Sequence, residues 1–396
     1  MAENGKDRLR PFMKPTIALV RGKFLNQYEM QVYEPLVNRY DITAFGSKTS
    51  FHDSFAFPVV KCWSAIDFSG GARSRSARRI QLALLNRLFV DAHYLLGLEK
   101  ALNGFDIAHT AETYYRYTSQ CLNAKRDGRV KAVIATVLET IPYNNEGIWG
   151  RKAMKERARN EVDHFIAITK RAKDALIIEG TNPNKISVIP YGIDTERFTV
   201  AHAKKDARRV DILYVGRLEK EKGVLDLLEA FKILSDKRVY LTIVGSGSLT
   251  LPPMDHVTFI ESSYDDMPKV YQKADIFVAP SKPHFAKSTR GTSYMTWEEQ
   301  YNIALLEAQA SGLAIITTNS GAIPENVGNA ALLIKPNDIQ ALVVALRLLI
   351  TDSSLRVSLG NAARYRAETV HDGKIISKKI DFLYQEVLSS AKAKKK

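Results

Sequence analysis

The sequence predicts an α/β protein with two doubly wound parallel sheets, one in each of two domains. Short apolar runs typical of strands alternate with helical patterns along the chain. The length of 396 residues exceeds what one hydrophobic core usually uses. Pro190 and Gly192 form a turn signal between two sets of predicted strands, and a charged segment follows them. We therefore expect domains at residues 1–190 and 191–371, followed by a C-terminal amphipathic helix at 372–391.

Each expected domain has its own set of strands. In the first domain these are TIALV, DITAF, FDIAHT, KAVIATVLE, HFIAIT and SVIP. In the second domain they are DILYVGR, LTIVGS, HVTFI, ADIFVAP and LAIITTN. Two open sheets that face each other create a cleft lined by the carboxyl ends of their strands, which is where such sheets bind ligands. Functional residues are therefore expected just after the strands.

The composition is that of a globular protein, with 45% hydrophobic and 25% charged residues. No run approaches the roughly 18 to 20 apolar residues of a membrane span. The N-terminal MAENGKDRLR lacks the apolar stretch of a signal peptide. Cys62 and Cys121 stand apart without a metal-type spacing, so neither a disulfide framework nor a zinc site is expected. These features predict a cytoplasmic protein.

The positive charge is concentrated in the first half of the chain. Residues 1–190 carry 29 Lys and Arg against 19 Asp and Glu, within a chain of net charge +14. Much of this excess lies in residues 73–89, where arginines accompany leucines. Such a basic amphipathic segment can lie on an anionic bilayer, which would place the protein at the inner face of a membrane. A surface helix whose leucines pack on its own domain explains the pattern equally well.

Two glutamates frame an apolar segment in TWEEQYNIALLEAQASG. The residues from Asn302 onward predict a helix that is apolar on nearly all sides and ends with a C-cap signal at Gly312. An ionised Glu307 in such a helix needs a partner, because burying an unpaired charge costs several kcal/mol. That partner is either a ligand hydroxyl or the protein backbone. Glu299 and Glu307 would lie roughly 12 Å apart on a helix, so they suit the two ends of an extended ligand.

A turn between a strand and a helix carries two cations. The strand DILYVG leads into Arg217, Lys222 and Gly223 before the helical VLDLLEAFKIL. A diphosphate there would meet a planar guanidinium, a point charge and the free N–H groups of the helix start, although loop lysines are usually only solvated. The next strand ends in IVGSGSLT, where Gly245 is expected to let the backbone approach a ligand. Without a third glycine, this is not a dinucleotide fingerprint. The later turn NSGAIPENVG either edges the same pocket or only connects two elements.

Taken together, these elements resemble the retaining family 4 glycosyltransferases of the GT-B fold, which has two Rossmann-like domains facing each other across a cleft. The resemblance is carried, in order, by VIPYGIDTERF, VGRLEKEKG, ADIFVAPS, EEQYNIALLEAQASGLAIITTNSGAIPE and ALLIKPND. It implies that residues 1–190 form the acceptor-side domain and residues 191–371 the nucleotide-sugar donor domain. It also implies that the helix at 372–391 crosses back to the first domain.

The resemblance implies roles for the second-domain residues. Arg217 and Lys222 match the pair that binds the donor diphosphate and stabilises the charge on the leaving group, an electrostatic contribution that is usually the largest in catalysis. Glu299 and Glu307 match a pair of glutamates of which the first contacts the transferred sugar and the second holds the ribose hydroxyls. Backbone groups around Asn302 and Ile303 would face the sugar and the phosphate.

Three positions depart from the family pattern. Asn302 stands where the family often has glycine; asparagine tolerates left-handed backbone angles, so the turn can survive while sugar selectivity stays open. The loop NQYE lacks the Gly-Gly that commonly precedes its glutamate. Ala111 stands where many relatives have a second histidine, so His109 alone keeps a candidate role, as a contact to the sugar or the acceptor. His109 and Glu139 end two predicted strands and are both expected to face the cleft.

We therefore expect an enzyme that moves a sugar from a UDP- or GDP-sugar to a glycan or lipid-linked acceptor with retained configuration. No Asp-x-Asp occurs, and the histidines and carboxylates lack ligand spacing, so neither a metal nor a further cofactor is expected. A nucleotide-sugar epimerase or hydrolase on the same fold is the nearest alternative. An isoelectric point near 9.5 also raises a nucleic-acid-binding protein, although no nucleic-acid module is recognised. A catalytically inert scaffold is the remaining alternative.

Overall fold

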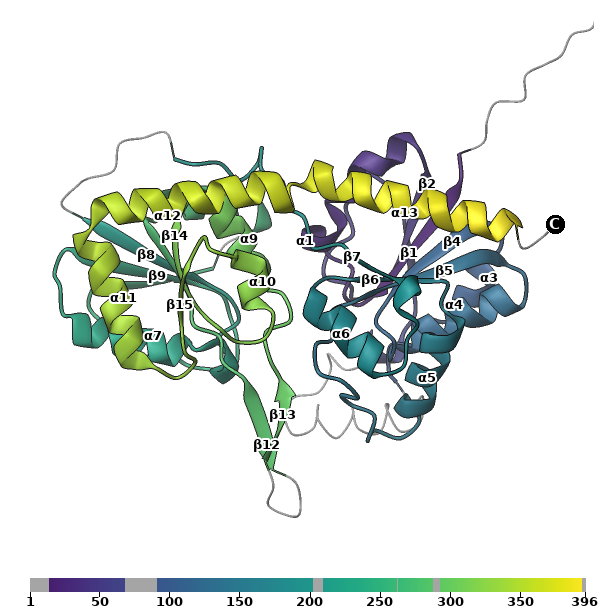
Figure 1. The fold of residues 1–396 in the computed structure, drawn as a ribbon, viewed down its shortest axis with the longest axis horizontal. Coiled ribbons are helices and arrows are strands. Elements are labelled where there is room, and N and C mark those ends of the chain that lie inside the picture. The colour runs from purple at the N-terminus through teal and green to yellow at the C-terminus, as the bar shows by residue number, and fades with distance from the viewer. Residues whose placement is uncertain (1–13, 68–90, 202–208, 262, 288–292, 394–396) are drawn as a thin grey trace, which may run out of the picture.

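A computed structural model describes residues 14–67, 91–201, 209–261, 263–287 and 293–393. It confirms the predicted fold class of two parallel α/β domains (Figure 1). Within the described residues, the first sheet has seven strands in the order β3-β2-β1-β4-β5-β6-β7. They are β1 (Thr16–Gly22), β2 (Asp41–Ser47), β3 (Val59–Cys62), β4 (Phe105–Ala111), β5 (Val130–Val137), β6 (His164–Ala167) and β7 (Ile186–Val188).

The second sheet repeats this winding with six strands in the described part of the chain, in the order β10-β9-β8-β11-β14-β15. They are β8 (Val210–Val215), β9 (Val239–Val244), β10 (Val257–Ile260), β11 (Ile276–Ala279), β14 (Ala314–Thr318) and β15 (Leu332–Ile334). An antiparallel hairpin of β12 (His284–Lys287) and β13 (Ser293–Trp297) extends from this domain (Figure 1). All eleven predicted strands are present, whereas β3, β15 and the hairpin were not predicted.

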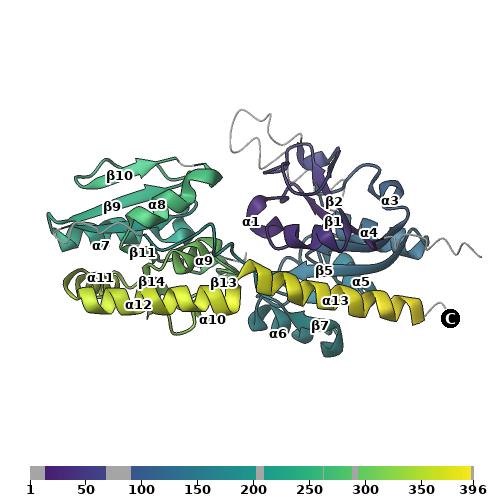
Figure 2. The same ribbon diagram turned by 90° about the horizontal axis from the view of Figure 1, so that it is seen from above.

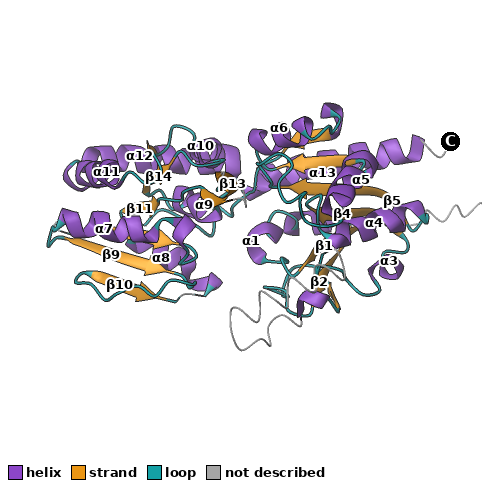
Figure 3. Ribbon diagram, turned by 90° about the horizontal axis from the view of Figure 1, so that it is seen from below, coloured by secondary structure: helices purple, strands orange, loops and turns teal. Residues whose placement is uncertain are grey.

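Helices cover both faces of each sheet (Figures 2 and 3). The first domain contains α1 (Gln27–Met30), η1 (Glu34–Asn38), α3 (Leu98–Ala101), α4 (Arg116–Arg126), α5 (Arg151–Glu161), α6 (Lys170–Ile178) and η3 (Pro183–Lys185). The second contains η4 (Lys220–Lys222), α7 (Val224–Leu234), η5 (Tyr264–Asp266), α8 (Met267–Lys273), α9 (Ile303–Ala310), α10 (Ile323–Val327), α11 (Ile339–Thr351), α12 (Ser353–Arg366) and η6 (Ala367–His371). Covering both faces explains why the central strands are apolar throughout; every residue of β11 and β14 is buried.

The last helix, α13 (Gly373–Ala393), lies along the first domain (Figure 1). Tyr40 donates a hydrogen bond to the Asp381 carboxylate at 2.7 Å, and Arg39 forms an ion pair with the same carboxylate. Ser377 donates to the backbone carbonyl of Val32. The predicted C-terminal amphipathic helix therefore exists, and it packs against the first domain although it follows the second in sequence.

The segment predicted to bind an anionic membrane, residues 73–89, lies outside the described residues. Among the helices that the structure describes, none is both long and apolar enough to cross a bilayer.

Candidate functional site

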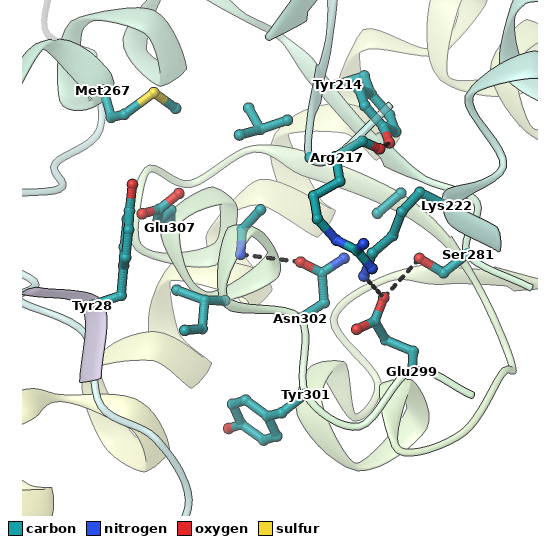
Figure 4. Close-up of a pocket in the computed structure, with 15 residues that line it drawn as sticks. Tyr28, Tyr214, Arg217, Lys222, Met267, Ser281, Glu299, Tyr301, Asn302 and Glu307 are labelled. Carbon is teal, nitrogen blue, oxygen red and sulfur yellow. Dashed lines mark hydrogen bonds and ion pairs between the residues drawn. The ribbon is translucent and has the colours of Figure 1, made fainter. Parts of the chain in front are cut away.

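A pocket of about 440 Å³ lies where the strands of the second domain end, facing the first domain. Its walls come from the end of β8 and the turn after it, the end of β11, the segment leading into α9, and α9 itself. The first domain contributes Tyr28 from α1 (Figure 4). The lining residues are Tyr28, Tyr214, Val215, Gly216, Arg217, Lys222, Met267, Ala279, Ser281, Glu299, Tyr301, Asn302, Ile303, Ala304 and Glu307. Every predicted second-domain site residue except Gly245 therefore lines one pocket.

Glu299 is held at one end of the pocket. Lys222 Nζ lies 2.6 Å from Glu299 Oε2, and the Ser281 hydroxyl donates to the same oxygen at 2.8 Å. The Lys222 ammonium also lies 4.8 Å from the centre of the Trp297 ring, a cation–π distance. Glu299 and Lys222 are both largely buried, with side chains 6% and 15% exposed, so the ion pair is shielded from water and fixes both groups.

Two glycines let the backbone bring this pair together. Gly223 has φ +71°, and a Cβ atom there would lie 1.9 Å from the Pro280 carbonyl oxygen. Gly321 has φ +56°, and its Cβ would lie 2.2 Å from the Glu299 carbonyl oxygen. Any side chain would clash at either place, because the contacted atoms are backbone. The turn NSGAIPENVG, which the sequence left open as pocket edge or connection, thus supports the backbone of Glu299.

Arg217 is the exposed cation of the site. Its side chain is 59% exposed and lies 3.3 Å from Glu221, while its carbonyl accepts a hydrogen bond from Tyr214 at 2.9 Å. The backbone is thus fixed while the guanidinium can turn toward a ligand. Gly245 does not line the pocket: it permits a close approach to Gly216, whose carbonyl oxygen would lie 2.0 Å from a Cβ at this position.

Glu307 lies at the other end of the pocket, beyond Asn302 (Figure 4). Asn302 caps α9 by accepting a hydrogen bond from the Ala304 N–H at 3.1 Å, so the helix begins at the pocket. The Tyr271 hydroxyl donates to Glu307 Oε2 at 2.6 Å, and Oε1 has no hydrogen-bond partner among the described residues. Burial raises the pKa of Glu307 to about 7, although Tyr271 and Arg197 lower it. The sequence predicted either a ligand hydroxyl or the protein backbone as the partner of Glu307. The partner within the protein is instead the side chain of Tyr271.

Two family models match consecutive parts of the chain. Residues 49–197 match Glycosyltransferase Family 4, and residues 195–366 match Glycosyl transferases group 1. Each of these regions therefore belongs to a glycosyltransferase family, and together they span residues 49–366.

Curated relatives agree with this assignment. The capsular polysaccharide biosynthesis glycosyltransferase CapM of Staphylococcus aureus is 28% identical over 256 residues, which cover 58% of this chain and 63% of that protein. A GDP-mannose-dependent phosphatidylinositol monomannoside mannosyltransferase of Corynebacterium glutamicum is 28% identical over 291 residues, covering 66% and 72%. A glycogen synthase of Mycobacterium tuberculosis is 27% identical over 232 residues, which cover 55% of this chain and 52% of that protein. The matched part of the chain thus spans between 52% and 72% of the length of these three relatives.

Solved structures share the fold of this glycosyltransferase at low identity. Sucrose-phosphate synthase from Thermosynechococcus elongatus superposes with a TM-score of 0.70 at 19% identity, covering 95% of this chain and 100% of that one. Anabaena HepE in complex with UDP-glucose gives a TM-score of 0.70 at 15% identity, covering 94% and 99%. At these identities the likeness establishes the fold alone.

The first-domain predictions for this glycosyltransferase need correction. His109 does not face the cleft: it is fully buried, with Nδ1 2.7 Å from the Tyr384 hydroxyl and Nε2 2.8 Å from the Thr136 hydroxyl. Burial lowers the pKa of His109 well below its ordinary value, so the ring is neutral. Glu139 is also buried and accepts hydrogen bonds from two backbone N–H groups and from Asn144. Both side chains are used inside the first domain, and a catalytic role of His109 remains only a prediction.

Several contributors to the site were not predicted from the sequence, among them Ser281, Tyr28 and Tyr271. Ser281 lies two residues after the end of β11, so the rule that ligands meet strand ends could have found it. Tyr28 follows a loop near the end of β1, but nothing in its sequence context indicates that it reaches the other domain. Tyr271 lies on α8, far from Glu307 in the chain, and only the tertiary structure brings the two together. In the described part of the chain, no group of three or more His, Cys, Asp or Glu side chains is arranged to hold a metal ion.

Proposed function

We propose that this glycosyltransferase moves a sugar from a nucleoside diphosphate sugar to an acceptor hydroxyl, with retention of the anomeric configuration. One observation carries the proposal: Arg217, Lys222, Glu299 and Glu307 line a single pocket at the carboxyl ends of parallel strands (Figure 4). Open α/β sheets bind their ligands at this edge. Anabaena HepE, a protein of similar fold, was crystallised with UDP-glucose, and the Corynebacterium relative is named as GDP-mannose-dependent, which together support a UDP- or GDP-linked donor.

The diphosphate would lie between the two cations and the start of α9. A helix N-terminus presents free N–H groups and a partial positive charge, both of which favour an anion. As the bond between the sugar carbon and the diphosphate oxygen breaks, negative charge grows on the diphosphate. Arg217 and Lys222 would stabilise that charge. In this proposal the two side chains supply the positive charge for which other transferases use a metal ion.

The two glutamates would hold the donor at its ends. Glu307 Oε1 is buried and has no hydrogen-bond partner in the described structure, so a ribose hydroxyl that donates to it would satisfy it. Lys222 and Ser281 both bind Glu299 Oε2, which fixes the carboxylate and leaves Oε1 to accept from a hydroxyl of the transferred sugar. The pocket thus matches an extended ligand with a sugar at each end and an anion between.

The configuration would be retained because the acceptor attacks the anomeric carbon from the same face as the one that the diphosphate leaves. The acceptor oxygen forms its bond to the anomeric carbon while the bond to the diphosphate breaks, and the hydroxyl proton passes to the departing phosphate oxygen. No protein nucleophile is required for this step.

The acceptor in this proposal is a glycan or a lipid-linked glycan. The Staphylococcus relative is named for capsular polysaccharide biosynthesis and the Corynebacterium relative for a phosphatidylinositol mannoside. The basic residues 73–89 would bring the protein to an anionic membrane surface. Flotation with vesicles tests this: we expect binding to vesicles with anionic lipid that weakens with salt, and equal indifference to anionic and neutral vesicles would contradict it.

A thermal-shift screen of UDP-, GDP- and ADP-sugars tests the donor. Preferential binding to the folded state raises the melting temperature, and we expect one base to give the largest shift. The best donor is then incubated with and without acceptor, and products are analysed. Glycosylated acceptor supports transfer, whereas an epimerised donor formed without any acceptor would establish the alternative enzyme. No shift with any sugar nucleotide would contradict the proposal.

A further inference from the structure

Helix α6 of the first domain begins against the second domain. Figures 1 and 2 show α6 and α10 side by side across the domain boundary. The N–H groups of Lys170 and Arg171, the first two residues of α6, donate to the two carboxylate oxygens of Glu325 on α10 at 2.6 and 2.9 Å. The third N–H, of Ala172, donates to the Thr169 side chain of the first domain. A carboxylate of one domain therefore caps a helix of the other, and the helix dipole favours it.

A second ionic contact lies beside this cap. Arg171 Nε and Nη2 donate to the two oxygens of Glu298 at 2.6 and 2.9 Å, a bidentate arrangement that fixes orientation as well as distance. The Glu298 side chain is only 3% exposed, while that of Arg171 is 46% exposed. Without the guanidinium, Glu298 would be a largely buried carboxylate lacking its cation, which is unfavourable. The contact should therefore form whenever the domains are close enough.

Glu298 and Glu325, the second-domain partners of α6, both lie in segments that hold the backbone of Glu299. Glu298 precedes it in the chain, so the bidentate ion pair fixes the backbone immediately before Glu299. On the other side, the Ala322 N–H donates to the Glu299 carbonyl at 2.9 Å, and Gly321 packs against the same carbonyl. Glu325 lies three residues beyond Ala322 in the same tight segment. Each contact of α6 thus reaches the Glu299 backbone through a short rigid connection.

We propose that Arg171, Glu298 and Glu325 form an interdomain latch that positions Glu299 against the donor sugar. The three are positioning residues, since none lines the pocket. The inference rests on the proposed function. It adds that contact between the domains controls how the sugar end of the donor is bound. When the domains are apart, the segments on either side of Glu299 lose their contacts to α6, while the ion pair of Glu299 with Lys222 inside the second domain remains. When the latch closes, the backbone on both sides of Glu299 is held against the first domain.

The latch should affect the two ends of the donor differently. Glu307 lies on α9, and its hydrogen bond comes from Tyr271 on α8, so neither depends on α6. Loss of the latch should therefore leave the affinity for a nucleoside diphosphate unchanged while weakening the contribution of the sugar. A purely structural role for Arg171 would instead reduce stability and all affinities together.

The experiment compares full-length Arg171→Ala, Glu298→Gln and Glu325→Gln with the wild type. Calorimetry measures dissociation constants for UDP or GDP, whichever the wild type binds, and for the matching sugar nucleotide. Turnover is followed as release of the nucleoside diphosphate. We expect unchanged affinity for the diphosphate, loss of most of the added affinity due to the sugar, and a fall in turnover of about tenfold to a hundredfold. Small-angle scattering should show a larger radius of gyration.

Arg157→Ala is the matched control, because Arg157 contacts Glu161 through both carboxylate oxygens at 3.0 Å within α5. It should change none of these values. The exchanged pair Arg171→Glu with Glu298→Arg should recover part of the turnover lost in either single variant. Wild-type affinity and turnover in both Arg171→Ala and Glu298→Gln would overturn the latch alone. A wild type that binds no nucleoside diphosphate or sugar nucleotide would instead overturn the proposed function, and the latch with it.

Discussion

Arg21 at the end of β1 and Arg217 just after β8 occupy matching places in the two sheets, yet their surroundings differ. Arg21 is 1% exposed and donates to the His109 carbonyl at 2.9 Å and to the Tyr33 hydroxyl at 3.3 Å. The Arg217 side chain is 59% exposed at the edge of a pocket. The same winding thus places a cation at the same strand end, but one domain uses it internally and the other presents it to a ligand.

The buried carboxylates extend this comparison. Glu112 follows β4 with φ 57°, and burial together with the nearby Glu139 raises its pKa to about 8. Glu307 is raised to about 7 by burial, but it lines the pocket whereas Glu112 does not. A ligand can therefore relieve the cost of burying Glu307, while Glu112, whose Oε1 accepts a hydrogen bond from the Leu138 N–H, lies away from the pocket. A strand-end position is insufficient to identify a ligand contact; an open pocket beside it is also required.

The largest expected effect is on transfer by the second domain. Lys222→Ala should lower the rate at least about a hundredfold, because removing one preorganised charge contact costs 10² to 10³ in rate. Glu307→Ala should lower transfer about tenfold to a hundredfold, because it removes charge-assisted hydrogen bonds to the ribose. The rate is measured as nucleoside diphosphate release in the presence of acceptor. Circular dichroism must show that both variants are folded. Full activity in both would remove the site assignment.

The two arginines should respond in opposite ways. Arg21→Ala should lower the free energy of unfolding by about 3 kcal/mol or more, since it leaves buried polar groups, including Glu29, without their partner. Arg217→Ala should change stability by about 0.5 kcal/mol or less but weaken donor binding and transfer. Urea unfolding and calorimetry measure the two quantities. If Arg21→Ala impaired only transfer, the contrast between the domains would fail.

His109 allows a finer test of the same contrast. His109→Gln should reduce stability by about 1 to 3 kcal/mol, because it disturbs hydrogen bonds to Tyr384 and Thr136 inside the first domain. The turnover of the folded variant should stay close to that of the wild type. Loss of turnover at unchanged stability would restore the catalytic role predicted from the sequence.

The smallest expected effect is a pH dependence of donor affinity. The ionised form of Glu307 accepts hydrogen bonds from ribose hydroxyls, and its pKa is about 7 without ligand. Affinity should therefore rise with pH and be about tenfold weaker at pH 6 than at pH 8. Calorimetry at several pH values measures this. In Glu307→Gln the dependence through this range should disappear, and its persistence would assign it to another group.

The sequence identified the strands well because parallel strands covered on both faces are continuous apolar runs. It missed β12 and β13, whose residues are half-buried or exposed and show no such run. Arg217, Lys222, Glu299 and Glu307 were found because each lies in a motif next to a strand or an apolar helix. His109 was misplaced because β4 continues to Ala111, so the histidine lies within the sheet, and because Tyr384 of α13 reaches it from far along the chain.

The interdomain contacts had no counterpart in the sequence reasoning. Nothing in the sequence singled out Arg171 or Glu298, the first glutamate of EEQYN. Their pairing depends on how two domains meet, which neither periodicity nor local motifs encode. The same holds for the capping of α6 by Glu325.

A crystal structure with the bound nucleoside diphosphate sugar tests the central assignment most directly. We expect the diphosphate between Arg217, Lys222 and the start of α9, the ribose hydroxyls on Glu307, and the sugar on Glu299. A nucleotide bound elsewhere, with these four side chains not in contact with it, would contradict the account.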